Sequence, residues 1–349
     1  MQSKNVLVCF DTQNPCRTTK DLQGLLFLGG RGMPFLLKKK TLKPQETSKK
    51  AIFKTDHSKH MFETHVLKLS CRDQIGIVSK ISTLLANSRC NIVESKQFTD
   101  QQNVNFFIRQ SFTLHDPNIL AKLQYNLNLL SKELNAEFFL SEIESSMNTI
   151  MMVSKFDHCL NDLLFRIRSK SLNLNVKAII SNHKIAEDIA RFSKIPFYFL
   201  PINKTNKENQ EAKIKEIIYN NDIQLIVLAR YMQVLSEDFT NEFEGKVINI
   251  HHSFLPSFKG AKPYHQAYER GVKVIGATAH YVTKELDEGP IIEQDTQEVD
   301  HEMMPNDLVS MGRDIEARVL YRALKAHSEN RVFLNGKRTI VFKGQTVLG

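Results

Sequence analysis

The sequence predicts an α/β protein, with an open Rossmann-like sheet domain preceded by a small α+β unit of order β-α-β-β-α-β. After residue 146, apolar runs of strand length show little polar alternation and are separated by amphipathic helices, which is typical of a parallel sheet covered on both faces. Between residues 63 and 143, shorter strands alternate with helices. Because 349 residues exceed what one core usually serves, we expect a leader at 1–60, a small domain at 61–145 and a larger domain at 146–349.

The small domain is predicted from hydrophobic periodicity. Residues 104–109 alternate so that Val104, Phe106 and Ile108 share one strongly buried face of a strand. Asp116 followed by Pro117 is a typical helix start. The other expected elements are a strand at 66–69, a helix at 77–85, a strand near Ile92 and Val93, a helix with Leu120, Leu123 and Leu127 inward, and a strand at 136–140.

The larger domain follows a linker at residues 141–146. Its chain ends in "RVFLNGKRTIVF", where Asn335 and Gly336 between two apolar runs indicate a β-hairpin. Its expected strands are 149–153, 176–180, 197–200, 223–228, 246–250 and 275–282. Three helices are expected from their inward-facing apolar residues, which are Ile185 and Ile189 in the first, Ile214, Ile217 and Ile218 in the second, and Leu308, Met311, Ile315, Val319 and Leu324 in the third.

The net charge of +9 is concentrated in the leader. Residues 1–60 hold twelve Lys or Arg against four Asp or Glu, which leaves the rest of the chain nearly neutral. A nucleic-acid groove in the folded part is therefore not expected. No apolar run is long enough for a membrane helix, so we expect no membrane partner. The basic leader suits an organellar targeting segment or a plain extension, which leaves mitochondrial and cytoplasmic locations open.

The cysteines show no C-x-x-C pairing and are odd in number, which indicates reduced thiols in an intracellular protein. One of them, Cys159, is a candidate nucleophile, but a small core residue is the better interpretation. The five are Cys9, Cys16, Cys71, Cys90 and Cys159.

A candidate site lies in "INIHHS", where an apolar strand ends in polar side chains. Sites in open α/β sheets form at the carboxyl ends of strands. Residues two apart on a strand face the same side, so Asn249 and His251 are expected to share one face while Ile250 enters the core. An amide and an imidazole suit the stabilisation of an oxyanion and the transfer of a proton.

A carboxylate would complete this pair, and "HYVTKELDEGPII" offers Asp287 in a turn closed by Gly289 and Pro290. Considered alone, an aspartate at such a position more often serves only to form the turn. A zinc site is not expected, because no H-E-x-x-H spacing is present and adjacent histidines on a strand point apart. The sequence contains neither G-x-S-x-G nor a cysteine with a plausible base partner, so covalent acyl transfer has little support.

The segment "NIHHSFLPSFKGAKPYHQAYERGVKVIGATAHYVTKELDEGPIIEQD" resembles the folate-dependent formyltransferase family, whose signature is Asn-x-His, S-x-L-P and an Asp in L-D-x-G-P. The resemblance implies Asn249, His251 and Asp287 as the catalytic set and a folate pocket built largely from backbone. His280 is expected either to order water or to be a satisfied strand histidine. The substrate-binding residues that we expect are Tyr231, Met232, Gln233, Val234, Leu235, His280 and Thr283.

Residues 63–143, including "LSCRDQIGIVSKISTLLANSRCNIVESKQF", resemble the ACT domain, a small-molecule-sensing unit that usually pairs with copies of itself. The resemblance places Asp73 and Gly76 near a regulatory ligand, since glycine permits close backbone approach. A purely structural, dimer-forming role is the alternative. Either role favours a homo-oligomer.

An ACT-like unit followed by this core is the arrangement of the branch that hydrolyses 10-formyltetrahydrofolate to tetrahydrofolate and formate, with folate as substrate and no cofactor. The expected mechanism has Asp287, with His251, accepting a proton from the attacking water, while Asn249 and protonated His251 bind the oxyanion. A glycinamide ribonucleotide transferase is one alternative, although residues 154–159 lack a phosphate-binding glycine and contain Asp157. A non-catalytic folate sensor is the other.

Overall fold

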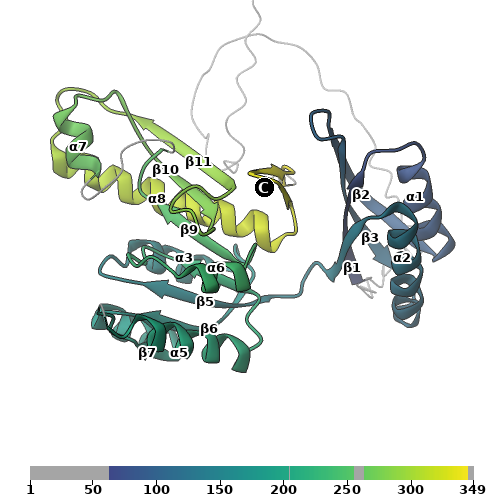
Figure 1. Cartoon of the computed structure of the whole chain (residues 1–349), viewed down its shortest axis with the longest axis horizontal. Helices are drawn as coiled ribbons and strands as arrows, with labels where there is room; N and C mark the ends of the chain where they lie inside the picture. Colours follow the sequence, from purple (N-terminus) through teal and green to yellow (C-terminus); the bar gives the residue numbers. More distant parts are fainter. Residues whose placement is uncertain (1–62, 204, 255–262, 345–349) are drawn as a thin grey trace, which may run out of the picture. The chain divides into compact units, whose positions relative to one another are not determined.

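The computed structural model describes residues 63–203, 205–254 and 263–344, so the predicted leader lies outside the described residues. These residues form a four-stranded sheet, a seven-stranded sheet and a two-stranded hairpin (Figure 1). None of the helices in these ranges has both the length and the apolar composition that a membrane crossing requires.

The four-stranded sheet is antiparallel in the order β2-β3-β1-β4, and α1 and α2 pack on one of its faces. Ile81 and Leu123 from the two helices are fully buried against Leu67 and Phe112 of the strands. The predicted β-α-β-β-α-β order is confirmed. The elements are β1 (Glu63–Arg72), α1 (Ile77–Asn87), β2 (Cys90–Asp100), β3 (Asn105–Leu114), η1 (Pro117–Ile119), α2 (Leu120–Leu134) and β4 (Glu137–Glu142).

The prediction for residues 104–109 was wrong in two respects. Val104 precedes β3 in a turn with φ 52°, and it is exposed. Both faces of β3 are buried, because Phe107 packs edge-on against Phe333 at 5.5 Å and Arg109 donates to the carbonyl oxygen of Glu329. The alternation of residue types could not reveal this, since the covering residues lie more than 200 positions away.

The seven-stranded sheet has the order β11-β10-β9-β8-β5-β6-β7. Its strands from β9 to β7 run parallel, whereas β10 is antiparallel to both neighbours, so the predicted all-parallel sheet is corrected to a mixed one. The strands are β5 (Met147–Val153), β6 (Leu174–Ser181), β7 (Phe197–Phe199), β8 (Leu225–Leu228), β9 (Val247–His251), β10 (Val274–Tyr281) and β11 (Ile291–Glu298).

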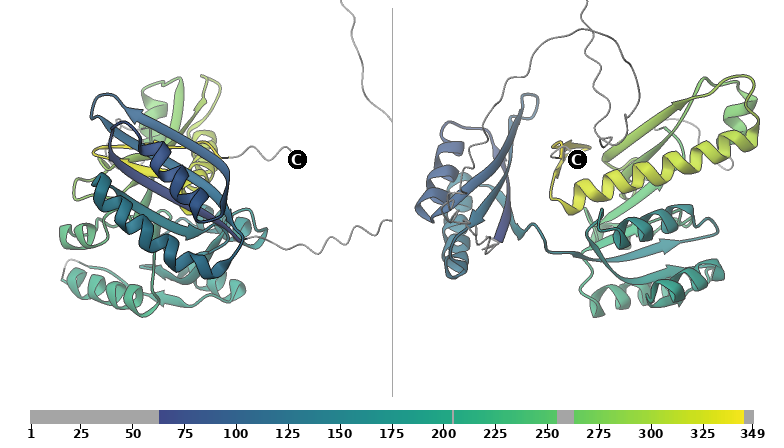
Figure 2. Two further views of the ribbon diagram at one scale, coloured as in Figure 1. Left: turned by 90° about the vertical axis from the view of Figure 1, so that its right-hand side faces the viewer. Right: turned by 180° about the vertical axis from the view of Figure 1, so that it is seen from behind.

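Helices cover both faces of this sheet. On one face, α8 lies lengthwise over β9, β10 and β11, as Figure 2 shows from behind. On the other, Ile214 and Phe239 pack against Ile150 and Ile226. The helices are α3 (His158–Arg168), η2 (Lys184–Ala186), α4 (Glu187–Ser193), α5 (Lys207–Asn220), α6 (Glu237–Glu242), α7 (Pro263–Glu269) and α8 (Pro305–Ser328).

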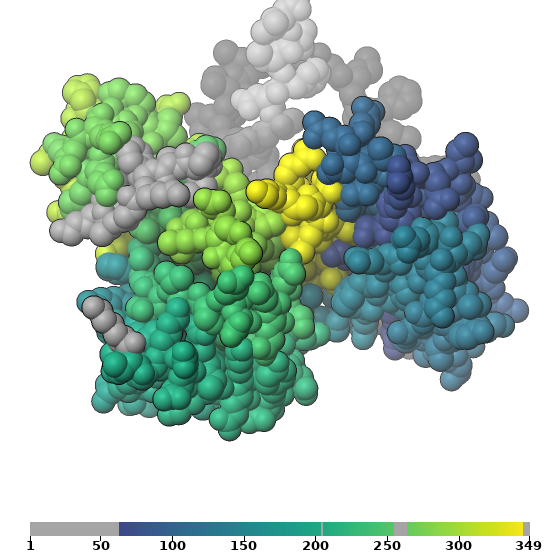
Figure 3. Space-filling view, viewed as in Figure 1, coloured from purple at the N-terminus to yellow at the C-terminus, as the bar shows by residue number. Residues whose placement is uncertain are grey.

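The predicted C-terminal hairpin is confirmed as β12 (Val332–Asn335) and β13 (Arg338–Val341). Gly336 in its turn has φ 60°, a left-handed conformation that glycine adopts without steric cost. The hairpin reaches the molecular surface in the space-filling view, where it is yellow (Figure 3).

One loop of the larger domain, residues 231–235 between β8 and α6, is fixed at its end by Ser236. Ser236 Oγ caps α6 by accepting from the Phe239 backbone N–H at 3.2 Å. The same residue donates through its backbone N–H (2.9 Å) and its hydroxyl to the buried carboxylate of Glu211 on α5. Two helices therefore set where this loop ends.

We expect Ser236→Ala to lower the free energy of unfolding by about 1–3 kcal/mol. It removes the helix cap and one of the donors to a buried carboxylate. Urea unfolding measures the change, and Ser310→Ala, at an exposed position of α8, is the matched control. Equal stability of the two variants would contradict this role of Ser236.

Candidate active site

The predicted pair Asn249 and His251 lies at the carboxyl end of β9. Both side chains line a cavity of about 260 Å³, and Ile250 between them is 3% exposed and belongs to the core. The expected arrangement on one face is confirmed. Strand alternation puts the amide and the imidazole on the cavity side because the intervening residue is apolar.

Asp287 joins this pair although 36 residues separate it from His251. Asp287 Oδ1 lies 3.2 Å from His251 Nδ1. The aspartate has φ 58°. Two residues later, the backbone of Gly289 passes so close to Tyr281 that an added Cβ would lie only 1.7 Å from the Tyr281 carbonyl oxygen. Glycine at 289 is therefore required by backbone contact, which gives the L-D-x-G-P pattern a physical basis.

His280 on β10 lies opposite Asn249 in the antiparallel register. Its Nδ1 is 2.8 Å from the Tyr281 carbonyl oxygen, which can only accept, so Nδ1 carries the hydrogen in the neutral ring. Nε2 then accepts from Asn249 Nδ2 at 3.3 Å. This bond orients the carboxamide and leaves its second N–H for the cavity.

The electrostatics of the site favour an ionised aspartate among imidazoles. Burial alone would raise the pKa of Asp287, but the hydrogen bond from His251, with the His280 ring also close by, outweighs it and holds that pKa well below its ordinary value. Burial, assisted by Arg230, lowers the pKa of His252 to about 4, so its ring is neutral at pH 7. His252 follows the end of β9, and its ring centroid is 5.1 Å from that of His251, so these rings do not point apart as expected.

The expected substrate-binding residues all line the same cavity. Tyr231 is buried, and burial raises its pKa to about 12, whereas Met232 and Val234 are exposed at the rim. The backbone of this loop is held at one point by the Ser154 hydroxyl, which accepts from the Met232 N–H at 3.0 Å. The predicted lining residues found there are Tyr231, Met232, Gln233, Val234, Leu235, His280 and Thr283.

Several lining residues were not singled out from the sequence. Arg230 and His252 lie directly beside the candidate residues Tyr231 and His251, and these positions were the only signal for them as single residues. Thr240 comes from α6, whose place in the wall depends on the fold, and Leu228 belongs to β8. The family resemblance implied the segment 282–287 as a whole, and its further lining residues are Val282, Lys284, Glu285 and Leu286.

The two residues assigned to a regulatory ligand lie before α1. Gly76 has φ 94°, and a Cβ added there would meet no heavy atom within 4 Å. The left-handed conformation therefore accounts for glycine at this position, and the space beside it is open. Asp73 is exposed, and its backbone N–H donates to the Val104 carbonyl oxygen at 2.8 Å.

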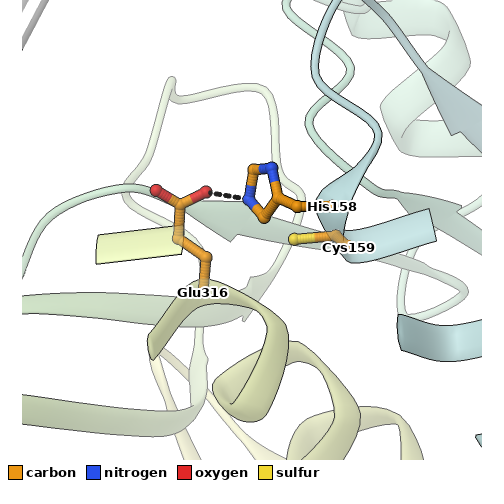
Figure 4. Close-up of side chains that lie close together, drawn as sticks. All are labelled: His158, Cys159 and Glu316. Atoms are coloured by element: carbon orange, nitrogen blue, oxygen red, sulfur yellow. Dashed lines mark hydrogen bonds and ion pairs between the residues drawn. The ribbon is translucent and has the colours of Figure 1, made fainter. Parts of the chain in front are cut away.

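A group that could be mistaken for a metal site lies near α3 and α8. His158, Cys159 and Glu316 offer ligand atoms within 4.8 Å of one another, and Figure 4 shows the His158 ring facing the Glu316 carboxylate. Burial raises the pKa of the Cys159 thiol well above its usual value, so the thiolate needed for coordination is disfavoured. Arg230 Nε already lies 3.2 Å from Glu316. These conditions suit an ion pair better than a metal.

Comparison with known proteins gives a consistent result. A family profile described as Formyl transferase matches residues 147–324. The chain is 47% identical over 280 residues to a formyltetrahydrofolate deformylase of a Corynebacterium species, covering 80% of this chain and 98% of that protein. The crystal structure of the Burkholderia mallei formyltetrahydrofolate deformylase aligns with a TM-score of 0.78 at 43% identity, over 80% and 100% of the two chains. Glycinamide ribonucleotide transformylase 1 of Symbiobacterium toebii aligns with a TM-score of 0.53 at 27% identity, over 57% and 95%.

We expect Asp287→Asn to destabilise the fold by an amount that depends on pH. Because the pKa of Asp287 is depressed in the folded state, its stabilisation is present above the unfolded pKa of about 3.9 and is lost as pH falls toward the folded value. The difference in unfolding free energy from the parent should be present throughout pH 5 to 7 and should shrink below about pH 4.

Urea unfolding over this pH range measures that difference. Asp238→Asn, at an exposed position of α6, is the control for loss of a carboxylate. A difference that stays undiminished below about pH 4 would be incompatible with an Asp287 carboxylate whose pKa is depressed in the folded state.

Proposed function

Since this chain belongs to the formyltetrahydrofolate deformylase family, we propose that it hydrolyses 10-formyltetrahydrofolate with Asn249, His251 and Asp287 as its catalytic residues. The products are tetrahydrofolate and formate. The observation that carries the residue assignment is the 3.2 Å contact between His251 Nδ1 and Asp287 Oδ1 beside Asn249, in a cavity at the carboxyl end of β9.

In this proposal, His251 is the group that moves the proton. Its Nδ1 faces a carboxylate that can only accept, so Nδ1 carries the hydrogen and Nε2 has the free lone pair. Nε2 takes a proton from water as the water oxygen bonds to the formyl carbon. The imidazolium then gives this proton to the departing folate nitrogen when the carbon–nitrogen bond breaks.

Asp287 has a narrower role here than the sequence interpretation gave it. A carboxyl group whose pKa lies well below its ordinary value is a weak proton acceptor at neutral pH. We therefore assign Asp287 to orienting His251 and stabilising its protonated form. The formic acid formed in the cavity loses its own proton to a water molecule there, which leaves formate beside Asp287.

Asn249 is assigned to the oxyanion. When water adds, the carbonyl electrons move to the formyl oxygen, which then needs hydrogen-bond donors. One N–H of Asn249 is committed to His280 Nε2, and the other is available. Since His280 fixes the carboxamide before the reaction, the donor does not have to reorganise in the transition state.

Water is the acceptor in this proposal, and no cofactor or metal is required. An amine acceptor with a phosphate, as in the glycinamide ribonucleotide transferases, is less suited to the loop after β5. That loop has no glycine, and it presents Asp157 at the start of α3. An anionic phosphate would be repelled by this carboxylate.

We further propose that residues 63–142 form an ACT-like unit that makes the protein a homo-oligomer, with Asp73 and Gly76 near its ligand. The element order and the left-handed glycine before α1 support this. Folate is the proposed small-molecule partner, without nucleic acid or membrane. The compartment, mitochondrial or cytoplasmic, depends on the leader.

The reaction is tested by incubating the full chain with 10-formyltetrahydrofolate in the absence of any amine acceptor. We expect formate and tetrahydrofolate in equal amounts, because water alone completes the reaction. Formate is measured with a coupled dehydrogenase assay. If tetrahydrofolate forms only when an amine is added, with the formyl group on that amine and no formate released, the chain is a transferase; if substrate binds without turnover, it is a sensor.

For Asn249→Ala we expect kcat to fall by about 10²- to 10³-fold, as for loss of one preorganised oxyanion donor. Folate binding should change much less, because the cavity is lined by many other residues. Steady-state kinetics separate kcat from KM. Asn209→Ala on the exposed side of α5 is the matched control, and parental turnover by Asn249→Ala would remove the oxyanion assignment.

A further inference from the structure

A second cavity of about 440 Å³ adjoins the first within the larger domain. The two cavities share three lining residues: Arg230, Met232 and His252. On its far side, the second cavity is lined by His158, Tyr264, His265, Arg313 and Glu316. The reaction proposed above uses none of these five side chains.

Arg230 is the most unusual group in this cavity. Its side chain is 9% exposed, and its Nη1 has no hydrogen-bond partner among the described residues. Nε lies 3.2 Å from Glu316 Oε2, although not in hydrogen-bond geometry. A buried guanidinium normally has its donors satisfied, so an unused N–H here points to a missing acceptor.

Glu316 is the only carboxylate among the described lining residues, and it is already engaged. Glu316 accepts from the Tyr264 hydroxyl at 2.7 Å and faces His158 Nε2 at 2.8 Å, as Figure 4 shows for the histidine. Burial would raise the pKa of Glu316, but these partners and Arg230 hold it below its ordinary value. Glu316 therefore balances one guanidinium.

A second guanidinium remains without such a balance in the cavity. The Cζ atoms of Arg230 and Arg313 lie 5.6 and 5.7 Å from the centroid of the Phe156 ring. Both guanidinium groups thus approach the same aromatic side chain. With one carboxylate against two arginines, the cavity carries an excess positive charge that favours an anion.

The proposed reaction creates such an anion next door. A neutral formyl group becomes formate beside Asp287, which is held ionised. Two negative charges in the same cavity repel each other, so formate is driven away from the catalytic carboxylate. Arg230 lines both cavities, so its guanidinium is a positive charge between the place where formate forms and the second cavity.

We infer that the second cavity binds the product formate, with the Arg230 guanidinium as its principal ligand and Arg313 as a second cation. A carboxylate matches the planar fork of a guanidinium. The inference rests on the hydrolysis proposed above. It assigns the cavity to the release of the product.

The first experiment measures formate binding without turnover. The full chain, free of folate, is titrated with ¹³C-formate, and NMR line broadening reports the bound fraction. We expect saturable binding. Arg230→Lys, which keeps a charge beside Glu316 but removes the fork, should weaken it roughly tenfold. Arg313→Gln, at an exposed position, should weaken it roughly threefold.

Arg322→Gln is the matched control on the same helix, because it removes a guanidinium that pairs with Asp295 outside the cavity. It should bind formate as the parent does. Absence of saturable binding, or parental affinity in both Arg230→Lys and Arg313→Gln, would overturn the inference. So would displacement of formate by a lower concentration of inorganic phosphate at matched ionic strength, since the site would then select phosphate.

A second experiment ties the cavity to the reaction. Formate added to the hydrolysis assay should inhibit the parent, and its inhibition constant should rise in Arg313→Gln by the same factor as the binding constant. The inhibition constant of tetrahydrofolate should not change. If the chain releases formate but formate inhibits parent and variant equally, the cavity assignment fails while the hydrolysis stands. If no formate is released, the hydrolysis proposal fails, and the titration still reports on the cavity.

Discussion

The antiparallel pairing of β10 with β9 is the constraint on which the site depends. In a sheet that is otherwise parallel from β9 to β7, this reversal sets His280 opposite Asn249. It also begins the loop that brings Asp287 back to His251. If β10 ran parallel to its neighbours, its polar residues would emerge at the same edge, but this cross-strand bond would not form.

The distribution of protons follows from that backbone arrangement. The Tyr281 carbonyl oxygen fixes the hydrogen of His280 on Nδ1, and the Asp287 carboxylate fixes that of His251 on Nδ1. One imidazole is thereby made an acceptor for a carboxamide, and the other presents a free nitrogen to the cavity. Two rings of the same chemistry acquire different tasks because their neighbours differ.

Much of this could be predicted from the sequence, but only where the signal is local. Alternation placed Asn249 and His251 on one face, and apolar runs located β5, β6, β8 and β9. Asp287 was a candidate because the pair lacked a carboxylate, and the family resemblance then selected it, since nothing in its own turn distinguishes it. The antiparallel edge, the bond between His280 and Asn249 and the contact of Arg230 with Glu316 join segments distant in the chain, so periodicity carried no information on them.

The backbone of Asp287 lies at φ 58°, a region that residues other than glycine occupy at a cost of roughly 1 kcal/mol. Glycine would relieve this strain at the expense of the carboxylate. Because the ionised carboxylate also stabilises the fold through His251, replacement by glycine would exchange backbone strain for the loss of that contact. Heat resistance selected in the laboratory should therefore arise elsewhere in the scaffold, and the strain at this position should persist together with the acid.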